Sequence, residues 1–379
     1  MKKNISYSLK LNEELSISKT SKNMIIKSEN LSALQYLSEN LKNKIQLIYI
    51  DPPYNTQQSF EYYEDQMKQD EWLHFMEERL IKAKQLLKDE GFIWIQIDDN
   101  ELAYLKVLCD KIFGRHNFRN MFSVGRTVKS TNQQYSRLKS YNQAVEYILC
   151  YGKTEKATLN RVLKPSDKKE HTEGQWKTFF QRDERKTMQY DILGASLETG
   201  HWIWKKERAM KALENYQKYE IYCQEHGELP LKEYWEKEGK NQEYIKRVST
   251  SQSKDKGVRY WIPPKYGIML TTNWTDVLAY ENNGLFPTGK SERLLERIIE
   301  LSTYSSEDIV LDFFAGSGTT GIAAHKCNRA WVLIEKESQV ETIIVPRFYD
   351  LFKGQGTYIK KAYPGDFSFY HMENSTKDE

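Results

Sequence analysis

A glycine-rich turn between an apolar strand and a helix, within residues 309–335, constrains the fold of this 379-residue chain more than any other feature. Residues 309–311 are Ile, Val and Leu, which predict a buried strand that ends at Asp312. The turn leads into a helix predicted at 318–327, and a second apolar strand follows at 330–335. Because strand, helix and strand alternate here, the chain is predicted to fold as an α/β protein.

The glycines of this turn have spacings that are typical of nucleotide-binding loops. Glycine lets the backbone approach a ligand closely, and the helix N-terminus favours polar or anionic groups. Gly316 and Gly321 match the spacing of a phosphate-binding P-loop, but Ile322 and Ala323 stand where that loop has Lys and then Ser or Thr, which largely excludes it. The same glycines with Gly318 fit the dinucleotide pattern numerically, a weak signal because no βαβ unit opens the chain.

Glu335 closes the strand that follows the glycine turn and its helix. It lies about 20 residues after Gly316, which is the usual distance to the acidic residue in such folds. An acidic residue at this strand end holds the hydroxyl pair of a ribose. Glu335 is therefore predicted to bind the ribose of a cofactor.

A second motif, Asp51-Pro52-Pro53-Tyr54, directly follows the apolar run 45–50. That run predicts a short buried strand, and the two prolines end it because neither can donate a hydrogen bond to a sheet. The carboxyl ends of strands in open α/β sheets are where ligands bind. Tyr54 could hold a flat ring there while the motif offers acceptors to an exocyclic amine. For the tetrapeptide alone, a plain Pro-Pro turn with a surface Tyr is an equal alternative.

Together the two motifs resemble those of the DNA amino-methyltransferases, which use S-adenosylmethionine. The segment 51–54 resembles their catalytic motif, and Phe314-Ala315-Gly316-Ser317-Gly318 resembles their F-x-G-x-G cofactor loop. The catalytic motif comes first, as in the circularly permuted β group. Further segments agree: 72–80 and 91–101 are similar to the modification subunits of type III restriction systems, and 286–291 with 294–299 resembles the family's final motif. The resemblance covers roughly residues 24–151 and 261–340.

This resemblance implies a Rossmann-like class I methyltransferase core, circularly permuted, with a mostly helical DNA-recognition insert. The first part of the core is predicted at 1–122 and the second at 261–362. The target-recognition region lies between them at 123–260, although 142–152 is predicted to return a strand to the core. Residues 363–379 form a C-terminal tail, which is predicted to be disordered from His371.

The implied reaction is methyl transfer from S-adenosylmethionine to the N6 amino group of adenine in DNA, within a restriction-modification or related system. The implied catalytic residues are Asp51, Pro52, Pro53 and Tyr54. The implied cofactor-binding residues are Asp312, Phe314, Gly316, Gly318, Glu335, Thr288, Lys290, Glu29 and Asn30. No metal is implied.

Two of these positions depart from the family pattern, because Ser28-Glu29 stands where Gly-Asp is frequent and Ser291 follows Lys290 where Pro is usual. N4-cytosine methylation is the nearest alternative, since it uses the same amine geometry. A DNA-recognition subunit with an inactive core is another, although the intact Asp51 and Tyr54 speak against it. An RNA or protein methyltransferase would usually carry its cofactor loop before the Pro-Pro motif.

The net charge of +3 hides an asymmetry along the chain. Residues 121–260 contain 27 Lys and Arg against 19 Asp and Glu, whereas the remainder contains 29 against 34. Positive charge can neutralise DNA phosphates. The residues predicted to bind DNA are Arg126, Lys129, Arg137 and Lys139. The alternative is a charged, solvated helical insert, because 207–247 has the pattern of charged helices.

The remaining pattern completes the outline. The chain is predicted to be cytoplasmic. Its cysteines form no C-x-x-C pair, and the sequence shows neither a signal peptide nor an apolar run long enough to cross a membrane. Its predicted partners are double-stranded DNA and, by analogy, a second copy of the chain and a restriction subunit. The run 114–125 is predicted to be a connection between elements. The other elements predicted in the core are strands at 24–26, 45–50, 91–97 and 308–312 and helices at 31–42, 70–88, 101–112 and 291–303.

Overall fold

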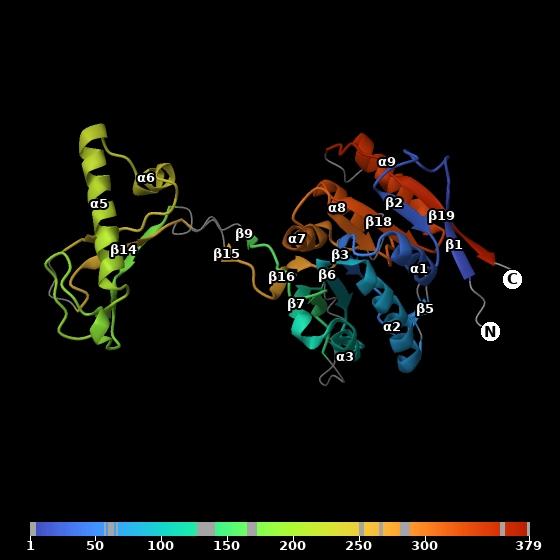
Figure 1. The fold of residues 1–379 in the computed structure, drawn as a ribbon, viewed down its shortest axis with the longest axis horizontal. Helices are drawn as coiled ribbons and strands as arrows, with labels where there is room; N and C mark the ends of the chain where they lie inside the picture. Colours follow the sequence, from blue (N-terminus) through green and yellow to red (C-terminus); the bar gives the residue numbers. More distant parts are fainter. Residues whose placement is uncertain are drawn as a thin grey trace, which may run out of the picture. The chain divides into compact units, whose positions relative to one another are not determined.

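The computed structural model describes residues 5–56, 58–59, 64–65, 67–126, 141–164, 173–249, 254–264, 268–280, 289–356 and 361–376. The chain divides into two compact units (Figure 1). The core unit comprises 1–162 with 271–379, and the insert unit comprises 163–270. The sequence places the insert at 123–260, so the compact insert unit begins later and ends later than that segment.

A ten-stranded sheet forms the centre of the core unit, in the order β1-β19-β2-β18-β17-β3-β6-β8-β7-β16. The strands from β19 to β6 are all parallel, whereas β8 runs antiparallel to both of its neighbours and β1 runs antiparallel to β19. The strand bounds are β1 Ile5–Leu11, β2 Met24–Lys27, β3 Ile45–Ile50, β6 Leu87–Ile97, β7 Phe118–Gly125, β8 Val145–Gly152, β16 Asn273–Leu278, β17 Ile309–Asp312, β18 Ala330–Glu335 and β19 Ser368–Thr376.

Helices cover both faces of this sheet, with α1 to α3 on one side and α7 to α9 on the other (Figure 1). Their bounds are α1 Asn30–Asn40, α2 Gln69–Leu86, α3 Leu102–Phe113, α7 Glu292–Ser302, α8 Thr319–Lys326 and α9 Val345–Lys353. Short elements accompany them: the strand pair β4 Gln58–Ser59 and β5 Glu64–Asp65, the 3₁₀ helix η1 Arg115–Asn117 and the π-helix η3 Val340–Ile344.

The central strands are apolar because both faces of the sheet are covered. All six residues of β3 are buried, and Trp72, Met76 and Leu80 of α2 pack into the same core. On the other face, α8 lies so close to β18 that a Cβ on Gly321 would meet Leu333 Cδ1 at 2.7 Å. Tight packing of α8 therefore fixes the loop that precedes it.

The insert unit combines helices with a small sheet. Its long helix α5 spans Lys206–His226, α6 spans Leu231–Lys237, and the antiparallel sheet has the order β10-β14-β13. The helices fit the charged pattern of 207–247. The unit is not mostly helical as the resemblance implies, because among its described residues α5 and α6 cover only 206–226 and 231–237, and short strands, turns and loops make up the rest. The other bounds are β9 Leu163–Lys164, β10 Gln175–Thr178, β11 Phe180–Gln181, η2 Lys186–Met188, β12 His201–Trp202, β13 Ile245–Arg247, β14 Val258–Ile262 and β15 Ile268–Met269.

Two local predictions are wrong. The run 114–125, predicted to be a connection, contains the strand β7, whose Arg119 and Asn120 interrupt the apolar pattern where the strand is less buried. The tail predicted to be disordered from His371 contains most of β19, which pairs with β1 on one side and β2 on the other. Its backbone hydrogen bonds go to the N-terminal segment, a partner that no local pattern reveals.

Candidate active site

The two sequence motifs meet at the centre of the sheet. Strands β3 and β17 are parallel neighbours, with Leu311 opposite Ile48, so Asp51 and Asp312 lie at the same edge. From β17 the chain continues through α8 to β18, whereas from β3 it continues through α2 to β6 on the other side. A pair of strands whose connections diverge in this way opens a crevice at its carboxyl end, where ligands bind in such sheets.

Packing and hydrogen bonds hold the Asp51–Tyr54 loop in place. Pro52 is buried, and the carbonyl of Pro53 accepts a hydrogen bond of 2.8 Å from the indole of Trp72 on α2. Asn55, which has a positive φ of 57°, donates to Glu101 Oε1 at 2.8 Å. The loop that follows β3 is thus anchored by two helical segments, which fixes the direction of its polar groups.

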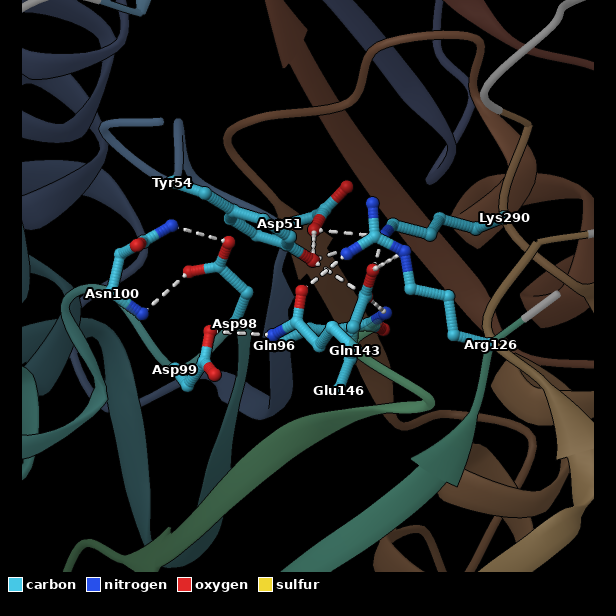
Figure 2. Close-up of polar contacts among 10 residues, drawn as sticks. All are labelled: Asp51, Tyr54, Gln96, Asp98, Asp99, Asn100, Arg126, Gln143, Glu146 and Lys290. Carbon is cyan, nitrogen blue, oxygen red and sulfur yellow. Dashed lines mark hydrogen bonds and ion pairs between the residues drawn. The ribbon is translucent and has the colours of Figure 1, made fainter. Parts of the chain in front are cut away.

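Lys290 brings a positive charge to this loop from a distant part of the chain (Figure 2). A β-bridge to Tyr280 holds it just before α7, and its side chain is 8% exposed. Its Nζ lies 3.0 Å from Asp51 Oδ1, and it donates to Tyr54 Oη at 3.1 Å. Nζ also lies 3.9 Å from the centre of the Tyr280 ring. Lys290, which the resemblance assigns to the cofactor, therefore contacts the predicted catalytic motif.

Glu146 is a buried carboxylate near Asp51 that the sequence motifs did not indicate. Glu146 of β8 is fully buried, and its Oε2 lies 3.0 Å from Tyr54 Oη and 3.6 Å from Lys290 Nζ. Gln96 of β6 donates to the same oxygen at 2.7 Å and accepts from Tyr49 Oη at 2.6 Å. The signal available in the sequence was a carboxylate and an amide within otherwise apolar strands.

Burial and charge oppose each other in this cluster. Burial raises the pKa of Asp51, while the Lys290 ammonium and the Tyr54 hydroxyl partly offset that increase. Burial alone would lower the pKa of Lys290, but the carboxylates of Asp51 and Glu146 outweigh it and raise that pKa. Burial would also raise the pKa of Glu146, yet Lys290 and the hydrogen bond from Gln96 hold that pKa below its usual value. These pKa directions describe an ionised lysine shared between two carboxylates.

The glycine turn forms the other half of the site. Gly316 and Gly318 have φ values of 53° and 78°, a region that favours glycine. The amide of Gly316 donates to Glu335 Oε2 at 2.9 Å, which joins the turn to the end of β18. Asp312 accepts from the amide of Phe314 at 2.9 Å and from the Thr320 hydroxyl at 2.6 Å, and burial raises the pKa of Asp312 to about 7.

Glu29 and Asn30 lie beside this turn and have structural partners. Glu29 caps α1 by accepting from Ser32 N at 3.0 Å, and it pairs with Arg79 at 2.5 Å. Asn30 accepts from Arg79 at 2.6 Å and donates to the carbonyl of Phe313 at 2.9 Å. Arg79, which the motifs did not indicate, therefore links α2 to the glycine turn.

Comparison with known proteins identifies the family of this chain. The model of a DNA methylase family, N6_N4_Mtase, matches residues 45–346. The chain belongs to this family. The match includes both Asp51–Tyr54 and the glycine turn, so the paired motifs lie in the part that defines a DNA methylase.

Three curated relatives of this chain differ in length and in name. The "Probable type III restriction-modification enzyme HindVI Mod subunit" of Haemophilus influenzae is 31% identical over 93% of this chain and 54% of its own length. The type II methyltransferase M.KpnI of Klebsiella pneumoniae is 28% identical over 91% and 89%. The DNA adenine methyltransferase YhdJ of Escherichia coli is 25% identical over 81% and 77%. The chain thus spans about half of the type III subunit and most of the other two.

Of the residues predicted to bind DNA, the structure describes only Arg126. Arg126, just after β7, donates to Gln143 Oε1 at 2.6 Å, and its Nε lies 3.7 Å from Glu146 Oε1 (Figure 2). Gln143 in turn donates to Asp99 Oδ1 at 2.7 Å. Arg126 therefore has partners within the core unit. Thr288, Lys129, Arg137 and Lys139 lie outside the described residues.

Within the described ranges, no cluster of three or more His, Cys, Asp or Glu side chains could hold a metal ion. In the same part of the chain, every helix is too short or too polar to cross a membrane.

Proposed function

We propose that this chain transfers a methyl group from S-adenosylmethionine to the N6 amino group of adenine in DNA. The observation that carries the proposal is the placement of Asp51 and the glycine turn on neighbouring parallel strands, at the crevice where their connections diverge. Membership of the DNA methylase family supports the substrate and reaction class. Adenine is favoured because the motif begins with Asp and because one relative is named a DNA adenine methyltransferase.

The glycine turn fits the proposed cofactor. Among the residues that the structure describes, a Cβ on Gly316 would have only Phe314 O near it, at 3.9 Å, so these residues leave room beside this backbone. The Glu335 carboxylate accepts from the amides of Gly316 and Lys336 and retains lone pairs for a ribose hydroxyl pair. Asp312, Phe314, Gly318, Glu29 and Asn30 are proposed to shape the same pocket. When bound, S-adenosylmethionine supplies an electrophilic methyl group.

The chain itself supplies acceptors and positioning for the amine. The exocyclic nitrogen of adenine is a poor nucleophile because its lone pair is delocalised into the ring. Asp51 and the carbonyl of Pro52 accept its two N–H groups, which favours a tetrahedral nitrogen and directs the lone pair towards the methyl group. Tyr54 stacks on the base. Close in-line positioning provides the acceleration, so no covalent intermediate with the protein is required.

The base must leave the duplex to reach this crevice, at a cost of roughly a few kcal/mol. We propose that the insert unit and the basic residues near 126–139 bind the surrounding DNA and determine which sequence is methylated, since residues 121–260 carry the excess of positive charge.

The names of the relatives support a role in a restriction-modification system. A homodimer and a restriction subunit as partners remain predictions, as does the circular permutation of the core.

Mass spectrometry of nucleosides tests the proposal directly. The purified chain is incubated with S-adenosylmethionine and unmethylated bacterial DNA, which is then digested to nucleosides. N6-methyldeoxyadenosine in this sample, and far less of it with the Asp51→Asn variant, is the expected result. Detection of N4-methyldeoxycytidine would show that the chain methylates cytosine instead of adenine. No methylated nucleoside with a folded chain that binds DNA would reject the enzymatic function.

A further inference from the structure

Glu146 is a carboxylate where the fold would ordinarily place an apolar side chain. It lies on β8 between apolar neighbours and is fully buried. Burying a carboxylate costs several kcal/mol unless partners compensate for the lost water. Three of its partners belong to the candidate site or support it: Tyr54 at 3.0 Å, Gln96 at 2.7 Å and Lys290 at 3.6 Å. Its other oxygen lies 3.7 Å from Arg126 Nε. The position of Glu146 is therefore tied to the catalytic motif.

Glu146 and Asp51 compete for the same two donors (Figure 2). The single hydroxyl proton of Tyr54 can go to Asp51 Oδ1, 2.7 Å away, or to Glu146 Oε2, 3.0 Å away. The Lys290 ammonium lies between the same oxygens, at 3.0 Å and 3.6 Å. Without Glu146, both donors would be committed to Asp51 Oδ1, which would leave that oxygen less able to accept an N–H of the target amine.

The orientation of Glu146 is fixed from behind by neighbouring strands. Tyr49 of β3 lies 2.6 Å from Gln96 Oε1, which turns the Gln96 amide nitrogen towards Glu146. All three side chains are buried, in strands that are adjacent in the order β3-β6-β8. Polar groups that are buried and hydrogen-bonded in series hold a single geometry. The hydrogen bonds from Tyr49 through Gln96 to Glu146 thus hold the Glu146 carboxylate where it can accept the Tyr54 hydroxyl proton.

We propose that Glu146 is a positioning residue for the methyl transfer: by accepting the Tyr54 hydrogen bond and sharing Lys290, it releases Asp51 Oδ1 to accept the N–H of the target amine. This inference rests on the proposed function. Glu146 does not touch the substrate itself, so its effect passes through Tyr54 and Lys290. Its loss lowers the rate of the bound complex rather than the affinity for DNA or cofactor.

Glu146→Gln is the first test, because glutamine keeps the volume and removes the charge. The expected result is a kcat roughly 10- to 100-fold below wild type, the range for loss of a group that orients other site residues without touching the substrate. The dissociation constants for S-adenosylmethionine and for DNA should stay within about twofold. Glu155→Gln, on an exposed residue just beyond the same strand, is the matched control and should retain wild-type kcat.

Coupling to Tyr54 separates positioning from a purely structural role. In a Tyr54→Phe background the hydroxyl is gone, so Glu146→Gln should lower kcat clearly less than it does in the wild-type background. Equal fold losses in both backgrounds would overturn the proposal. Glu146→Asp, which restores the charge, should recover part of kcat.

Tyr49→Phe keeps the proposal testable if Glu146→Gln fails to fold. It removes only the hydroxyl that orients Gln96, and kcat should fall several-fold with unchanged KM for DNA. Wild-type kcat in Tyr49→Phe, or in a folded Glu146→Gln, would overturn the inference. These outcomes are read against an active wild-type chain; a wild-type chain that methylates no DNA would instead reject the proposed function.

Discussion

The amine of Lys290 lies 3.0 Å from Asp51 Oδ1, although the two residues are far apart in the sequence. Lys290 is held by its bridge to Tyr280, and Asp51 by the end of β3. The ion pair is largely buried, so each partner depends on the other to offset its lost hydration. Substitutions at Asp51 must therefore be chosen so that the chemistry is tested without leaving an unpaired buried lysine.

Asp51→Asn is expected to lower methyl transfer at least about 100-fold, on the scale seen when one positioned polar group is lost. The amide keeps an oxygen near Lys290 but removes the charge that favours a tetrahedral amine. Radiolabelled methyl transfer measures the loss, and calorimetric titration should show nearly unchanged affinity for S-adenosylmethionine. Asp70→Asn, on the exposed first turn of α2, is the control. Substantial turnover by a folded Asp51→Asn variant would falsify the role of Asp51.

Glu335→Ala is expected to weaken binding of S-adenosylmethionine about 10- to 100-fold. A hydrogen bond to a charged group contributes about 1.5–3 kcal/mol, and Glu335 also accepts from the amide of Gly316. Affinity for DNA should change little. Calorimetric titration measures the first quantity and fluorescence anisotropy the second. Glu307→Ala removes an exposed carboxylate at the opposite end of β17 and serves as control. Equal cofactor affinity in both variants would contradict the assignment.

Asp312 should make the stability of the protein depend on pH. Burial raises its folded-state pKa from the usual 3.8 to about 7, so between these values the folded protein holds a proton that the unfolded chain lacks. The contribution of Asp312 to the free energy of unfolding is therefore full below about pH 4 and is lost as the pH rises through about 7.

Asp312→Asn remains neutral at every pH and removes this dependence. The free energy of unfolding of the variant, relative to wild type, should rise as the pH increases from 5 to 8. Urea denaturation at several pH values measures it. The changed hydrogen bond to Thr320 adds a constant offset, so the slope carries the test. A difference that is independent of pH would show that Asp312 has an ordinary pKa.

The parts of this fold that the sequence predicted are those whose signal is local. The run 45–50 is apolar throughout and ends in two prolines, and the glycine turn with its flanking strands is a contiguous pattern. Glu146 was missed because its role depends on a contact with Lys290. The two residues are distant in the sequence and approach each other only in the folded protein. The strand β19 was missed for the same reason, since it pairs with β1.

The last prediction concerns the basic residues near the start of the predicted target-recognition region 123–260, which belong to the core unit. Lys129, Arg137 and Lys139 are predicted to bind DNA phosphates, whereas Arg126 is engaged by Gln143 and lies near Glu146. Replacing the first three together by Gln should lower DNA affinity and flatten its salt dependence, because each lost phosphate contact reduces the slope of log affinity against log salt by about 0.9. Arg126→Gln alone should have a much smaller effect on both quantities.

Fluorescence anisotropy across a salt series measures both the affinity and the slope, and calorimetry should show nearly unchanged affinity for the cofactor. The matched control replaces Lys10, Lys19 and Lys22, exposed lysines of the core unit, by Gln, which changes the net charge equally. A general charge effect would weaken both variants alike, whereas phosphate contacts would reduce the slope only in the first. If the first variant keeps the wild-type slope, the surface that faces DNA lies elsewhere, and the insert unit becomes the segment to test.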